Sequence, residues 1–192
     1  MIGRYKLFIS ALAAWAVVSA TSALAGTVVA PTTIDNDPDG ELGSGFRVEN
    51  LINQAGLSAP YTPGVTDFAS YTATTTHLIA SVNGNGAFAS PSNFVTSYDF
   101  LMDFGAALTL SGFALWNDTD EQGIGEFTVF AADAAYGSRV SLGSFTAGVA
   151  GDPMPSQVFD FTDATSRFFV ISATTIEPAN NLMNVGEFAF EA

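Results

Sequence analysis

The 192-residue sequence contains no cysteine, one histidine and few basic residues. The absence of cysteine excludes a disulfide framework and thiol catalysis, and a single histidine excludes a histidine-cluster metal site. After residue 25 there is no lysine, and only Arg47, Arg139 and Arg167 stand against all 19 carboxylates. So acidic a surface repels phosphate backbones and anionic lipid headgroups, which argues against nucleic-acid and membrane-surface binding, and it attracts divalent cations.

The first 25 residues have the layout of a secretory signal. Arg4 and Lys6 precede an apolar stretch over residues 7–20, and the small-residue exit 23–25 (Ala-Leu-Ala) comes before Gly26. The alternative is a membrane anchor, but the stretch is shorter than the roughly 20 residues that span a bilayer, and no later run is long enough. We therefore predict a signal peptide over residues 1–25 and export to the periplasm or outside a bacterial cell.

The rest of the chain, residues 26–192, is long enough to bury a core without disulfides, and one domain is the simplest organisation. It shows almost no helical periodicity. Short runs rich in Phe, Val, Thr and Ile recur instead, separated by turn-forming residues. The pattern predicts an all-β sandwich with a first strand at 27–30 and further strands at 76–82, 97–104, 107–115, 126–132, 157–161, 167–174 and 185–191.

Alternation within these runs assigns their faces, because successive strand side chains point in opposite directions. Phe188 and Phe190 share one face and predict a core, whereas residues 187, 189 and 191 share the other and predict a wet or functional surface. Residues 100, 102 and 104 repeat the apolar pattern. Within 107–115 the phase slips after Gly112, which predicts a β-bulge.

The order of several segments resembles a known family. These segments are residues 50–58 (NLINQAGLS), 99–105 (DFLMDFG), 110–117 (LSGFALWN), 127–133 (FTVFAAD), 166–171 (SRFFVI) and 186–190 (GEFAF). The chain resembles discoidin-like (coagulation factor 5/8 type C) domains of the galactose-binding-like superfamily, in the version on exported bacterial proteins that often carry a PEP-CTERM sorting tail. The resemblance covers nearly all of residues 26–192, and no sorting tail follows the last predicted strand.

The resemblance implies a jelly-roll β-sandwich that binds carbohydrate through loops at one end and often holds a structural calcium. Two positions here match the family's calcium ligands: Asn53 in the early loop, where many members have aspartate, and Glu187 in the last strand. Arg167 matches an arginine that tends to form a structural ion pair.

A second candidate calcium site lies at residues 35–41, where Asp35, Asp37 and Asp39 alternate before a glycine. Carboxylates at this spacing can converge on one hard cation, and glycine permits the sharp turn. Position twelve is Phe46 rather than the bidentate glutamate of an EF-hand. The alternative is a solvated acidic turn, since these residue types favour turns.

Trp116, Asn117 and Asp118 end a predicted strand and open a polar loop. An exposed indole can stack on the apolar face of a pyranose while amide and carboxylate groups take its hydroxyls. The alternative is a core indole at a strand end. Tyr61 and His77 lie near the early loops, and we expect them to be exposed enough to add stacking and hydrogen-bonding groups.

Enzymatic equipment is not visible. A serine triad could form only around His77, and no Gly-x-Ser-x-Gly elbow accompanies it. A carboxylate pair for glycoside cleavage can arise by chance among so many acids. We therefore predict a secreted, non-catalytic module that binds a glycan, braced by calcium. The alternatives are a structural or adhesive matrix protein that engages other proteins and a glycoside hydrolase.

Overall fold

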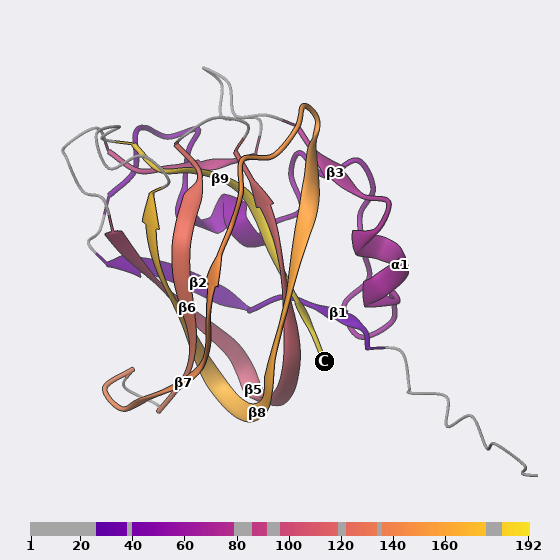
Figure 1. Cartoon of the computed structure of the whole chain (residues 1–192), viewed down its shortest axis with the longest axis vertical. Helices are drawn as coiled ribbons and strands as arrows, with labels where there is room; N and C mark the ends of the chain where they lie inside the picture. The colour runs from indigo at the N-terminus through magenta and orange to yellow at the C-terminus, as the bar shows by residue number, and fades with distance from the viewer. Residues whose placement is uncertain are drawn as a thin grey trace, which may run out of the picture.

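The computed structural model describes residues 26–37, 40–78, 86–91, 97–118, 122–133, 136–175 and 182–192 (Figure 1). The predicted signal peptide and Asp39 lie outside these residues. Within them no helix is long and apolar enough to cross a membrane. The elements in chain order are β1 (Val28–Val29), β2 (Thr33–Asp37), the 3-10 helix η1 (Val48–Ile52), α1 (Phe68–Thr72), β3 (Thr76–His77), β4 (Phe88–Ala89), β5 (Ser97–Asn117), β6 (Ile124–Ala132), β7 (Arg139–Thr146), β8 (Met154–Thr175) and β9 (Asn184–Glu191).

Two long, bent strands organise the fold. The first half of β5 pairs with β2 and the second half of β8, while the second half of β5 pairs with β9 and the first half of β8. All the pairings are antiparallel, and the strand order is β1-β9-β5-β8-β6-β7. The register shifts between Asp103 and Leu108, around Gly105 at φ 77°, and again between Leu110 and Gly112. These irregularities let both strands pass from one layer of the sandwich to the other.

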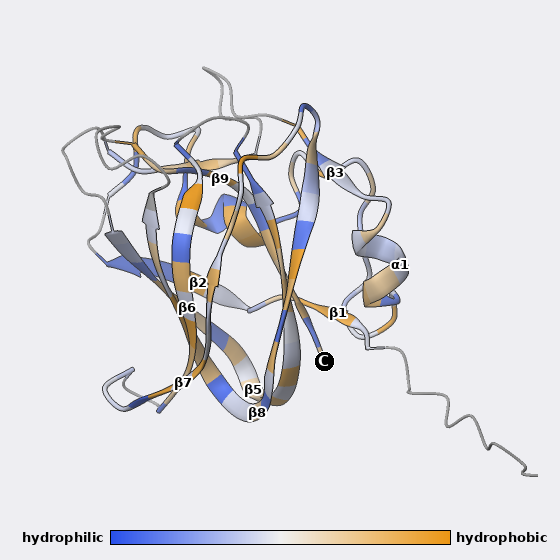
Figure 2. Ribbon diagram, in the orientation of Figure 1, coloured by the Kyte–Doolittle hydropathy of each residue, from blue (hydrophilic) through white to orange (hydrophobic). Residues whose placement is uncertain are grey.

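The predicted strands 97–104 and 107–115 are therefore two parts of one strand, as are 157–161 and 167–174. The bulge expected at Gly112 is confirmed. Hydrophilic and hydrophobic residues alternate along β6 and β8 (Figure 2). This alternation matches strands whose two faces meet different surroundings.

Aromatic rings fill the space between the two layers. Phe100, Phe113, Phe188 and Phe190 are fully buried. Phe188 lies edge-on to both Phe100 and Phe113, with ring centroids 5.2 Å apart in each case. Such edge-to-face contacts stabilise the core beyond simple area burial. The core positions predicted from alternation in β5 and β9 are confirmed.

The opposite face of β9 is not the wet surface that alternation predicts. Glu187 and Ala189 are buried, and Glu191 is partly buried. Residues 54–77, which include α1, cover this face and add a second apolar cluster. The cluster consists of Val28, Tyr61, Phe68, Tyr71, Ala114, Trp116 and Ala189. The sequence does not predict that this segment covers β9, because its helix has only five residues, too few to show helical periodicity.

Arg167 forms the structural ion pair that the resemblance implies. Its Nε and Nη2 donate to the two carboxylate oxygens of Asp103, each at 2.7 Å, and so join β8 to β5. This bidentate pairing, helped by the backbone N–H of Gly105, lowers the pKa of Asp103 to about 2.

The Arg167–Asp103 pair predicts a pH-dependent contribution to stability. Because the folded-state pKa of Asp103 lies below its unfolded value of about 3.9, the contribution is present above pH 4 and disappears as the pH falls toward 2. Arg167→Gln is expected to melt below the wild type at pH 6, with the difference closing near pH 2. A difference in melting temperature that stays constant down to pH 2 contradicts this role.

Candidate functional site

Trp116 lies in the second apolar cluster and has no exposed surface. Its indole Nε1 donates to the backbone carbonyl of Thr75 at 3.0 Å, and its ring lies edge-on to Tyr71. A fully buried indole cannot offer a face to a pyranose. The prediction of an exposed tryptophan is wrong, and the alternative of a core indole is confirmed.

Asn117 and Asp118 are also buried. The amide nitrogen of Asn117 donates to the carbonyls of Ile124 and Gly148 at 2.8 and 2.9 Å, and its oxygen accepts from the N–H of Ile124 at 2.7 Å. Asn117 thus ties the end of β5 to the start of β6. Residues 147–150 lie against this corner, where Ala150 donates its N–H to the carbonyl of Asp118. Asn117 and Asp118 therefore do not stand at the edge of an open loop that could face a sugar, as was expected.

Tyr61 and His77 are buried rather than exposed. Tyr61 lies edge-on to Tyr71, and its hydroxyl has no hydrogen-bond partner among the described residues. The ring nitrogens of His77 lie 2.5 Å from the carbonyl of Leu78 and 2.8 Å from that of Ala55. Burial lowers the pKa of His77. The expectation of exposed stacking and hydrogen-bonding groups at Tyr61 and His77 is therefore wrong.

The acidic run that begins at Asp35 is a strand where it is described. β2 pairs with β5 over residues 33–37, and Asp35 and Asp37 lie on its exposed face. In an extended strand, alternate side chains run parallel instead of converging on one ion. The predicted turn is therefore wrong for residues 35–37, which form a strand, and calcium binding by a run that includes Asp39 stays a prediction. No group of three or more His, Asp or Glu side chains able to hold a metal occurs in the described part of the chain.

The loop that carries Asn53 reaches Glu187 through Gln54, whereas the exposed side chain of Asn53 bonds within its own loop. Gln54, next to Asn53, donates its backbone N–H to both carboxylate oxygens of Glu187, at 3.1 and 3.2 Å. The side-chain oxygen of Asn53 accepts from the N–H of Ala55 at 2.7 Å. Glu187 is fully buried, and this desolvation raises its pKa well above the usual range. Calcium at this position stays a prediction.

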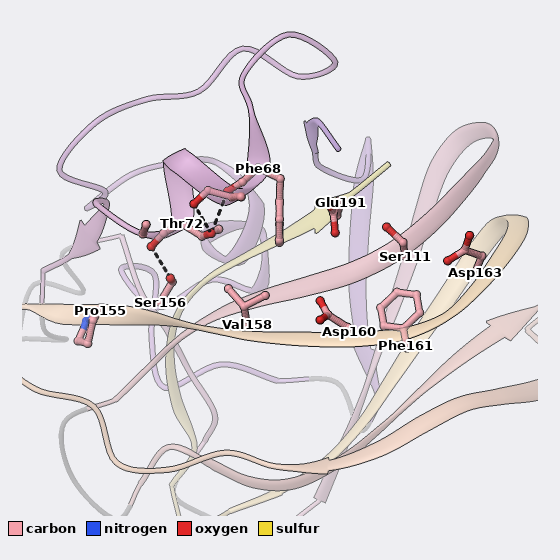
Figure 3. Close-up of a pocket in the computed structure, with 12 residues that line it drawn as sticks. Phe68, Thr72, Ser111, Pro155, Ser156, Val158, Asp160, Phe161, Asp163 and Glu191 are labelled. Atoms are coloured by element: carbon pink, nitrogen blue, oxygen red, sulfur yellow. Dashed lines mark hydrogen bonds between the residues drawn. The ribbon is translucent and has the colours of Figure 1, made fainter. Parts of the chain in front are cut away.

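A cavity of about 750 Å³ opens between α1 and strands β5, β8 and β9 (Figure 3). Asp67 caps α1 by accepting the N–H of Ser70 at 2.8 Å, and Ser156 of β8 donates its hydroxyl to the carbonyl of Thr72 at 2.7 Å. The first bond stabilises the start of the helix, and the second joins the helix to the sheet. The lining includes apolar Phe68, Val158 and Phe161, hydroxyl-bearing Thr72, Ser111 and Ser156, and the carboxylates Asp160, Asp163 and Glu191.

The register of three neighbouring strands places two of these carboxylates side by side. Asp160 of β8 and Glu191 of β9 both pair with Gly112 of β5. A Cβ at Gly112 would lie 2.9 Å from a carboxylate oxygen of Glu191 and 3.7 Å from one of Asp160. Both carboxylates therefore lie next to Gly112, and Figure 3 shows both in the space below α1. Val158, two residues before Asp160 on β8, is 45% exposed and offers an apolar surface beside them.

No basic side chain of the described residues neutralises this pocket. The ion pairs are Arg47 with Glu49, Arg139 with Asp99 and Arg167 with Asp103, all away from it. The pocket can thus accept hydrogen bonds and attract positive charge, while its apolar wall can contact a ring face. The sequence alone does not predict this pocket, because the acids come from different strands and no local pattern shows that they are neighbours.

Comparison with known proteins places the fold among carbohydrate-binding modules. No family model matches the chain, and no curated protein matches it. Many solved structures do match. One is chitosan-binding module 1 of a Paenibacillus chitosanase/glucanase, with a TM-score of 0.55 and 13% identity over 87% of this chain and 99% of that one. Another is the C-terminal domain of a Bacteroides fragilis chitobiase, with a TM-score of 0.56 and 11% identity over 86% and 97%. A third is the family 32 carbohydrate-binding module of Clostridium perfringens NanJ in complex with galactose, with a TM-score of 0.53 and 10% identity over 83% and 93%.

These likenesses show an antiparallel β-sandwich that resembles the jelly roll of family 32 carbohydrate-binding modules, as the sequence predicts. Two of the three are described as binding modules, and the third is the C-terminal domain of an enzyme chain. At 10–13% identity, the likeness is to the fold alone.

Proposed function

We propose that this chain is an exported, non-catalytic carbohydrate-binding domain and that the pocket beneath α1 holds the sugar. The observation that carries the proposal is the pairing of a partly exposed apolar wall with hydrogen-bonding oxygens on a fold shared with binding modules. Sugar sites use such a combination, because the ring face is apolar and the hydroxyls are polar. A glycoside hydrolase needs a carboxyl shielded from water as its general acid, whereas Asp160 and Asp163 are exposed.

The charge of the pocket favours a sugar that carries a free amine. Asp160, Asp163 and Glu191 line it, and no described arginine reaches them. A protonated amine gains charge-assisted hydrogen bonds from such carboxylates, whereas an acetylated amine does not. Among the matched structures, one module is described as chitosan-binding, and chitosan is a polymer of amino sugars. We therefore propose an amino-sugar polymer, such as a de-acetylated exopolysaccharide, as the ligand class.

Titration with chitosan oligosaccharides at pH 6 tests this proposal. Asp160→Asn is expected to weaken binding about tenfold or more, as loss of one charge-assisted hydrogen bond does. Asp35→Asn makes the same charge change on the exposed face of β2 and is expected to bind as the wild type does. Fully acetylated oligosaccharides are expected to bind more weakly than chitosan. Equal affinity of Asp160→Asn and wild type excludes the pocket.

Failure to bind any polysaccharide favours the alternative of a structural or adhesive matrix protein. Steady release of reducing sugar by purified protein contradicts the non-catalytic assignment. Detection of the unprocessed chain in the cytoplasm contradicts export, which rests on the pattern of residues 1–25.

We further propose that calcium, where it binds, does so at Glu187 with Asn53 beside it. The fit rests first on Glu187, which is a buried carboxylate. It rests also on the Tyr61 hydroxyl, which makes no hydrogen bond among the described residues. Burial above all, and next the charge of Glu187, raise the pKa of Tyr61. A cation there would offset the desolvation of the carboxylate and tie β9 to the loop after η1.

Thermal melting distinguishes the charged from the neutral state of Glu187. Without calcium, the raised pKa means that protonation of Glu187 contributes fully to stability below about pH 4.3, and this contribution is lost as the pH rises through the folded-state pKa. Glu187→Gln is expected to remove that decline. Calcium at pH 7 is expected to raise the melting temperature of the wild type but not of Glu187→Gln. Equal calcium shifts in both proteins contradict the site.

A further inference from the structure

Backbone hydrogen bonds to the start of α1 and to the C-terminal residue Ala192 fix the position of Gly26, the first described residue, and of its neighbour Thr27. Its carbonyl accepts the N–H of Phe68 at 2.9 Å. The next residue, Thr27, exchanges two backbone hydrogen bonds with Ala192, at 2.9 and 3.0 Å. The backbone at residue 26 is therefore set against both α1 and the end of β9.

The Glu191 carboxylate lies directly against Gly26. A Cβ at this position would fall 2.2 Å from a carboxylate oxygen of Glu191 and 2.6 Å from its Cδ, so the Glu191 side chain would have to move to admit a larger residue. The backbone nitrogen and an ideal Cβ are both bonded to Cα and lie about 2.5 Å apart, which puts the Gly26 nitrogen within about 5 Å of that oxygen. A charge on this nitrogen would lie within range of the carboxylate.

The charged side chains on the elements around Gly26 are all acidic. Glu191 approaches from β9, Asp160 from β8 across Gly112, and Asp67 from the start of α1, where it forms a β-bridge with Thr27. The arginines of the described residues pair with carboxylates elsewhere. A positive charge formed at Gly26 would therefore be attracted from each of these sides.

We propose that cleavage of the bond between Ala25 and Gly26 creates an α-ammonium group that forms an ion pair with Glu191, so that processing completes the joining of the chain ends. A signal peptidase hydrolyses the peptide bond with one water molecule. Ala25 leaves as a carboxylate on the released peptide, and the Gly26 nitrogen takes up protons to become an ammonium group at neutral pH. The predicted small-residue exit at 23–25 directs cleavage to this bond.

The composition of the chain permits an unusually selective test. Residues 26–192 contain no lysine, so the α-amine is the one primary amine of the processed protein. The full chain is expressed with its own signal, recovered after export and examined by intact mass, which is expected to correspond to a start at Gly26. Acetylation with an N-hydroxysuccinimide ester then removes a single positive charge. Acetylation is expected to lower the melting temperature of the wild type by about 1–3 °C and to leave Glu191→Gln unchanged.

Asp35→Asn serves as the matched control and is expected to lose as much melting temperature on acetylation as the wild type. An equal loss in Glu191→Gln, or a processed mass that starts elsewhere, overturns the proposal. A second measurement needs no variant: the rate of acetylation against pH gives the pKa of the α-amine. The pairing predicts a value above the ordinary range of about 7.7–8.0, and a value within or below that range overturns it.

Discussion

Trp116→Ala is expected to lower the free energy of unfolding by about 3–5 kcal/mol, the range for removing a large aromatic side chain from a packed core. The indole has no exposed surface, lies edge-on to Tyr71 and bonds to the carbonyl of Thr75, which loses its partner in the variant. Urea unfolding followed by circular dichroism measures the change. Val158→Ala, at a partly exposed position in the pocket, is expected to cost less than about 1 kcal/mol.

This result bears on how binding data are interpreted. Loss of sugar binding in Trp116→Ala would reflect unfolding and would say nothing about stacking. Trp116→Phe keeps an aromatic ring in the cluster and is expected to retain both most of the stability and full binding. Binding that disappears in a folded Trp116→Phe would contradict the core assignment of Trp116.

Asn117→Ala is expected to cost about 3 kcal/mol, because it strips partners from the N–H of Ile124 and the carbonyls of Ile124 and Gly148 at once. A buried polar group left without a partner costs about 1–3 kcal/mol. Asn117→Asp keeps the acceptor but directs a second oxygen at the two carbonyls, so it is expected to lose at least as much. Thr162→Ala, at an exposed position of β8, is the control and is expected to cost less than about 1 kcal/mol. Equal unfolding midpoints for Asn117→Ala and Thr162→Ala would contradict the bracing role.

The sandwich could be predicted because its signals are local. Alternation in β9 identified Phe188 and Phe190 as core, and the phase slip at Gly112 identified a bulge. The same alternation failed on the other face of β9, since it shows that two faces differ but not that a distant segment covers the second one. Residues 54–77 cover that face with Tyr61, Phe68 and Tyr71, and only tertiary packing reveals this.

The predicted site residues failed for a related reason. Trp116, Asn117 and His77 were expected at the surface because they adjoin polar or loop-forming residues. In the fold, each side chain bonds to a backbone carbonyl that lies far away in sequence. The acidic residues of the pocket could not be predicted from the sequence either. Asp160 and Glu191 become neighbours only through their shared register with Gly112.

The central claim is that a sugar binds in the pocket beneath α1. Amide chemical-shift mapping with a chitosan oligosaccharide on ¹⁵N-labelled protein tests it most directly, because it locates the ligand without altering the chain. The account predicts saturable shifts concentrated at residues that line the pocket, among them Thr72, Ser111, Ser156 and Asp160. Saturable shifts confined to residues away from α1 and the adjoining parts of β5, β8 and β9 would contradict it.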